Sequence, residues 1–132
     1  MNPRIGGSVE FAGRRRKAWE FAAVADLLYD EASDTVEGVD AYVVLAVNAG
    51  IADADAVCIA RLGHYNVGEN HRDAVRLLRK ADGPDAALSR LLGMKSKSAY
   101  DFEGISTKQL RVAKTALETL LAALDKVEPP RH

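Results

Sequence analysis

Residues 34–65, with the sequence DTVEGVDAYVVLAVNAGIADADAVCIARLGHY, decide the fold of this chain. Apolar or small side chains recur every three or four positions, as at Val39, Val43, Ala46 and Gly50, which is the repeat of a helix rather than of a strand. A second apolar set covers much of the remaining surface. We therefore expect one long helix that is buried on more than one side.

Polar residues and glycine mark the expected ends of this long helix. Asp34 and Glu37 have the spacing of a capping box, in which each side chain accepts a hydrogen bond from the backbone N–H of the other residue. From this box the helix is expected to continue to about Tyr65 and to end near Gly68.

Further helices are expected on both sides of residues 34–65. Ser8 is expected to cap the first helix. A short helix should begin at Asn70, and another should follow Pro84 and end at Gly93. The inner face of the first helix is expected to carry Phe11, Ala18, Ala22, Ala25 and Tyr29.

The last helix has the clearest start in the sequence. Ser106 and Gln109 form a second capping box, and Ile105 and Leu110 stand where a hydrophobic staple would place them. Apolar residues then repeat every three or four positions until Pro129. The sequence therefore predicts an all-α fold, an antiparallel up-and-down bundle of about five helices.

Length and composition indicate one domain over residues 1–132, with flexible ends at 1–7 and 128–132. The net charge of −1 gives no overall electrostatic attraction to nucleic acid or membranes. We expect no signal peptide and no apolar run long enough to span a bilayer. A single cysteine, Cys58, suits a reduced, cytoplasmic setting.

Several charged residues stand inside expected helices. Residues 14–17 are all basic and form either a solvated helix surface or a phosphate or partner contact. Asp53 and Asp55 lie among alanines in the long helix. If Asp53 is buried it needs a partner, for which Arg61 and Lys95 are candidates; the alternative is an exposed aspartate on a dimer rim or solvent face.

Two groups of residues are candidates for chemistry. His64 and His71 lack the further ligands of a metal site, so no metal and no cofactor are expected. Lys95, Lys97 and Tyr100 fall in an expected loop between helices, where they would either hold a phosphate and a base or form an ordinary loop with Tyr100 in the core.

Three segments in this order and spacing resemble the HEPN family (higher eukaryotes and prokaryotes nucleotide-binding domain). They are ADAVCIARLG at 54–63, GENHRDAVRLL at 68–78 and LLGMKSKSAYD at 91–101, the last followed by a long terminal helix. The resemblance covers nearly the whole chain. It implies an antiparallel helical bundle, often a homodimer, in toxin–antitoxin, phage-defence or stress systems.

Active members of that family are metal-independent ribonucleases, with an Arg, then a His, and commonly a Tyr close behind. The His assists attack by the ribose 2′-hydroxyl, and the Arg holds the phosphate charge. Here Lys95 stands in the place of the Arg, Ala99 in that of the His, and only Tyr100 fits. Because alanine transfers no proton, the resemblance favours a member without catalytic activity.

The first hypothesis is therefore a non-catalytic HEPN-like dimer that contacts a protein partner, or an RNA or nucleotide phosphate, through residues 95–100. Arg61, His64 and His71 are further candidates for phosphate binding. The alternative is a ribonuclease with a rearranged site that uses Lys95, Tyr100 and His71 or His64. The surplus of small apolar residues in the first two helices predicts that these helices pair across a two-fold axis.

Overall fold

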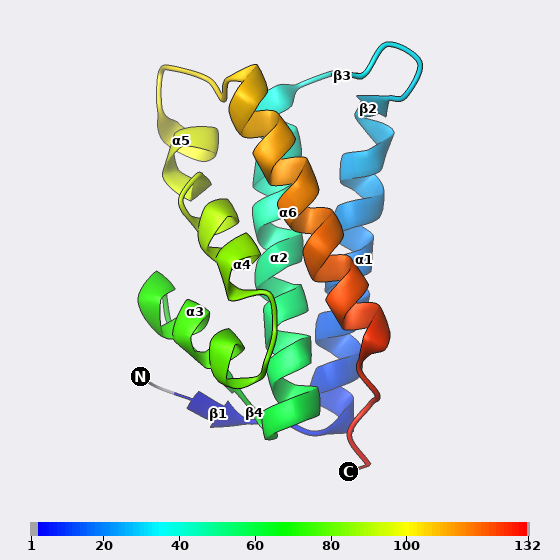
Figure 1. Ribbon diagram of the computed structural model, residues 1–132, viewed down its shortest axis with the longest axis vertical. Coiled ribbons are helices and arrows are strands. Elements are labelled where there is room, and N and C mark those ends of the chain that lie inside the picture. Colours follow the sequence, from blue (N-terminus) through cyan, green and yellow to red (C-terminus); the bar gives the residue numbers. More distant parts are fainter. Residues whose placement is uncertain (1–2, 132) are drawn as a thin grey trace.

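The computed structural model describes residues 3–131 and confirms the all-α bundle (Figure 1). Within the described residues, three long helices run along the molecule, and three shorter ones form its other side. The helices are α1 (Ser8–Leu27), α2 (Val39–Leu62), α3 (His71–Lys80), α4 (Asp85–Leu92), α5 (Lys95–Tyr100) and α6 (Thr107–Lys126).

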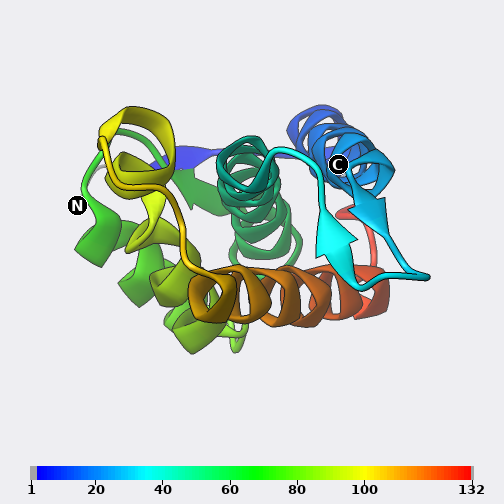
Figure 2. The ribbon, with the colours of Figure 1, turned by 90° about the horizontal axis from the view of Figure 1, so that it is seen from above.

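Helix α2 is the centre of the bundle, as its two-sided apolar pattern predicts. Viewed from above, it lies between α1 and α5, with α6 crossing on the other side (Figure 2). It packs against α1, α4, α5 and α6. A Cβ on Gly50 would lie 2.8 Å from Cδ1 of Leu91 in α4 and 3.3 Å from Cδ1 of Leu120 in α6. The missing side chain at Gly50 therefore lets α4 and α6 approach α2 closely.

The predicted start of α2 is wrong. The capping box of Asp34 and Glu37 does not form, and the helix begins at Val39 after Gly38, whose φ is +70°. Asp34 instead occupies the turn between β2 (Tyr29–Asp30) and β3 (Thr35–Val36), where its carboxylate accepts a hydrogen bond from the Tyr29 hydroxyl. Its φ of +53° suits a turn residue, since aspartate tolerates the left-handed region.

The predicted end of α2 is also wrong. The helix stops at Leu62, and Gly63, with φ of +77°, donates its N–H to the carbonyl of Ile59 over 2.9 Å. This is a glycine cap in the left-handed conformation. The next residues form β4 (His64–Asn66), which pairs antiparallel with β1 (Pro3–Ile5). The strand pair joins the beginning of the described chain to the end of its central helix.

Two helix starts are confirmed as predicted, and two differ. The Asn70 side chain accepts from the N–H of Asp73, and the Ser106 box has both of its hydrogen bonds. The first helix is capped by Gly7 rather than Ser8, with the Glu10 carboxylate accepting from the Gly7 N–H over 2.7 Å. Residues 95–100, expected as a loop, form the short helix α5.

By length and composition, α2 is long and apolar enough to cross a membrane, so the expectation of no such apolar run is wrong. The inside of the bundle accounts for this character, because 67% of its most apolar window is buried by the rest of the protein. Apolar character on all sides is what a central core helix requires.

Candidate functional site

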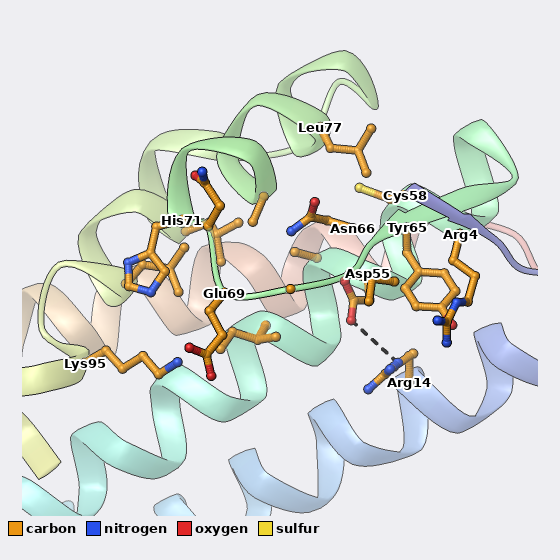
Figure 3. A pocket seen from close by; sticks show the side chains of 18 residues that line it. Arg4, Arg14, Asp55, Cys58, Tyr65, Asn66, Glu69, His71, Leu77 and Lys95 are labelled. Atoms are coloured by element: carbon orange, nitrogen blue, oxygen red, sulfur yellow. Dashed lines mark ion pairs between the residues drawn. The ribbon is translucent and has the colours of Figure 1, made fainter. Parts of the chain in front are cut away.

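A cavity of about 310 Å³ opens beside α2, under the segment that joins β4 to α3 (Figure 3). Its floor is apolar, with Cys58, Leu77 and Leu88 among the lining residues. Its polar wall combines four groups that carry or can take a positive charge with two carboxylates. These six residues are Arg4, Arg14, His71, Lys95, Asp55 and Glu69.

Four different elements bring the four basic side chains together. His71 is the first residue of α3, and Lys95 is the first residue of α5. The turn at Gly83 directs α4 back along α2, and as a result His71 and Lys95 line the same cavity. Arg4 is placed by the pairing of β1 with β4, and Arg14 comes from α1. Two candidates from separate stretches of sequence, His71 and Lys95, thus share one site.

An ion pair crosses one end of the cavity. Nε of Arg14 lies 3.5 Å from Oδ2 of Asp55, and the Arg14 guanidinium stands 5.5 Å from the centre of the Tyr65 ring. Burial raises the pKa of Asp55 to about 7, against the opposing effect of Arg14. Asp55 therefore changes charge near neutral pH, and its ionised form attracts Arg14 and repels an anion.

Two further polar groups of the site are informative. Asn66 lines the cavity, and its Oδ1 atom is buried and has no hydrogen-bond partner in the described part of the chain. Cys58 lines the floor, but burial raises the pKa of its thiol to about 12, so it stays protonated. The site is therefore not suited to nucleophilic attack by a thiolate.

The other predicted site residues lie outside this cavity. Nη1 of Arg61 donates to the carbonyls of Ala81 and Asp82 over 2.9 and 3.0 Å and ties α2 to the turn before α4. His64 stands in β4, opposite Ile5. Lys97 is half-buried in α5, and Tyr100 is 84% exposed, so the alternative that places Tyr100 in the core is wrong.

Asp53 also differs from both of its predicted settings. It is fully buried, and neither carboxylate oxygen has a hydrogen-bond partner within residues 3–131. Arg61 is engaged with the α3–α4 turn instead, and Lys95 lies at the cavity. Burial raises the pKa of Asp53 to about 8, so the carboxyl group is mainly protonated at neutral pH.

Sequence reasoning missed Arg4 and Asn66 as site residues, passed over Asp55, and considered Arg14 only as part of the basic run at 14–17. The sequence does carry a signal for Arg14 and Asp55. Asp55 is one of two acids in an alanine-rich helix, and a half-buried acid favours a basic neighbour such as one from the run at 14–17.

Residues 3–131 contain no group of three His, Cys, Asp or Glu side chains suited to a metal ion. Comparison with family models, curated proteins and solved structures gave no match.

Proposed function

We propose that this chain is a non-catalytic, dimeric HEPN-like binding protein of the cytoplasm, acting in a toxin–antitoxin, defence or stress system. Its ligand is the phosphate group of a mononucleotide or of an RNA end. The observation that carries this proposal is the shared position of His71 and Lys95 in one cavity with Arg4 and Arg14. A protein partner that contacts residues 95–100 remains compatible with the same role.

The size and chemistry of the cavity favour a small anion. Ligand pockets for small molecules usually begin at about 300 Å³, so a cavity of about 310 Å³ matches a mononucleotide better than an extended strand. For phosphate oxygens, Lys95 supplies a compact ammonium donor and Arg14 a planar guanidinium donor, and Asn66 adds a polar amide to the lining.

Lys95→Ala should weaken binding of adenosine or uridine monophosphate, measured by calorimetry at low salt, by about ten- to a hundredfold. The reason is the loss of one charge-assisted hydrogen bond of about 1.5–3 kcal/mol. His71→Ala should have a smaller effect in the same direction. Lys97→Ala is the matched control, because Lys97 lies in the same helix outside the cavity. Equal losses for Lys95→Ala and Lys97→Ala would contradict the proposal.

Asp55→Asn should change how nucleotide affinity depends on pH. About one unit below its pKa of about 7, Asp55 is neutral and the variant should bind like the wild type. About one unit above it, the ionised wild-type carboxylate repels the phosphate, so the variant should bind roughly tenfold more tightly. The variant-to-wild-type ratio is the quantity to plot, because the ligand's own titration cancels in it. A ratio that stays constant across this range would contradict the assigned role of Asp55.

A rearranged ribonuclease is the second candidate, and the shared cavity of His71 and Lys95 favours it too. It requires RNA cleavage that survives a metal chelator and is lost in His71→Ala. Tyr100 lies outside the cavity of its own chain, so a site that also uses Tyr100 would need a second copy to supply it. Absence of cleavage in the wild-type protein would remove this candidate and leave the binding proposal standing.

A further inference from the structure

An acidic aromatic segment, residues 100–103, comprises the last residue of α5 and the start of the loop that follows. Phe102 is fully exposed and Tyr100 nearly so, with Asp101 and Glu103 exposed beside them. Large aromatic side chains in solvent, next to one another and flanked by charges, are typical of a contact surface rather than of a monomer's surface. The segment fits an apolar recess with a basic rim.

A recess of that kind lies on the same chain, between α3 and α4. This basic groove has a volume of about 350 Å³ and is lined by His71, Arg72, Val75, Arg76, Arg79, Ser89, Leu92 and Gly93. Its lining contains three arginines and no acid. Two of these arginines form ion pairs with acids that do not line the groove: Nη1 of Arg76 lies 3.8 Å from Oδ1 of Asp73, and Nε of Arg79 lies 2.8 Å from Oδ2 of Asp85. The side chains of Arg76 and Arg79 are nevertheless 59% and 66% exposed. Val75 and Leu92 give it an apolar floor.

We propose that two copies of this chain pair reciprocally, each placing Phe102 in the basic groove of the other, with Asp101 and Glu103 against the arginines on its rim. This inference rests on the proposed dimer and assigns its interface. The segment follows α5, and the groove lies between α3 and α4. In Figure 1, α5 and α3 lie on the same side of the bundle, with α5 toward one end and α3 toward the other. An antiparallel two-fold arrangement therefore brings both contacts together at once, since residue i meets residue j and j meets i.

The surface suggested by the sequence, on the first two helices, is largely used inside the chain. Ala18, Ala22 and Ala25 of α1 are buried in the monomer, as are 13 of the 24 residues of α2. Helix α1 still exposes four large apolar side chains, Val9, Trp19, Val24 and Leu27. Leu27 is the most exposed of them, at 83%, and serves as the probe of this competing interface.

Charge reversal tests reciprocity directly. One variant carries Arg72→Glu and Arg76→Glu, and a second carries Asp101→Lys and Glu103→Lys. When either variant pairs with itself, the segment and the groove carry charges of the same sign at both contacts. Each variant alone should therefore be a monomer at concentrations where the wild type is a dimer, as measured by light scattering on a sizing column. Mixed in equal amounts they should form a heterodimer, because both contacts then join opposite charges. Phe102→Ala should also be monomeric, and Leu27→Lys should remain a dimer.

The outcomes separate the interface from the dimer itself. A wild-type dimer that persists in both charge variants and breaks with Leu27→Lys overturns the interface and leaves the dimer. Charge variants that stay monomeric when mixed likewise overturn it. A wild type that is monomeric at high micromolar concentration overturns both. Circular dichroism of each variant checks that these surface changes leave the helices intact.

Discussion

Asp53→Asn should raise the free energy of unfolding by several kcal/mol in mildly alkaline solution and change it little in acid. Burial raises the pKa of Asp53 from 3.8 to about 8 in the folded protein. Between these two values the folded state keeps a proton that the unfolded state has lost, so stability falls as pH rises through this window. At about 1.36 kcal/mol for each pKa unit, the total is on the order of 5 kcal/mol, and asparagine removes it.

Urea unfolding of both proteins across this range measures the effect. The wild-type curve should fall between the two pKa values and level off above the higher one, and the variant curve should lack this component. Asp125→Asn is the control, because Asp125 is an exposed acid of α6 and its replacement should leave the wild-type slope in place. Parallel curves for the wild type and Asp53→Asn would show that Asp53 is ionised in the folded protein.

Leu91→Ala should lower the free energy of unfolding by about 2–5 kcal/mol, and Gly50→Ala should restore part of that loss. Leu91 is fully buried, so its truncation removes apolar contacts and leaves a cavity. A methyl group on Gly50 would meet Cδ1 of Leu91 at 2.8 Å in the wild type and crowd it. Without Leu91 the same methyl group fills vacated space, and alanine also favours the helix by up to about 1 kcal/mol.

A double-mutant cycle measured by urea unfolding tests this reversal. The change in the free energy of unfolding caused by Gly50→Ala should be more stabilising in the Leu91→Ala protein than in the wild type. The difference between these two changes is the coupling energy of the two sites. Leu124→Ala provides the control background, because Leu124 is buried in α6 but is not among the nearest neighbours of Gly50. Equal effects of Gly50→Ala in all three backgrounds would mean that the three helices do not converge on Gly50.

The helical core was predictable from the sequence because its signals are local. The spacing of apolar residues identified the central helix, and Asn70 and Ser106 started helices as their side chains predict. The errors at Asp34 and Gly68 have a different origin. A hairpin and the pairing of His64–Asn66 with Pro3–Ile5 replaced helical turns there, and the second depends on a contact between residues far apart in the chain.

The candidate site was predictable only in part for the same reason. His71 and Lys95 carried a recognisable chemistry, but their common cavity depends on how α4 returns along α2. Arg14 and Asp55 belong to different helices, and their pairing follows from helix packing rather than from spacing along the chain. Tyr100 has the right residue type for a site, yet solvent surrounds it.

Helix α3 is a common wall, because His71 lines both the cavity and the basic groove. If both proposals hold, a nucleotide that repositions His71 also changes the surface offered to the second copy. Thermodynamic linkage makes such an effect reciprocal: the factor by which the ligand strengthens pairing equals the factor by which pairing strengthens ligand binding. The apparent affinity for the nucleotide would then depend on the concentration of the protein itself, and so on its level of expression.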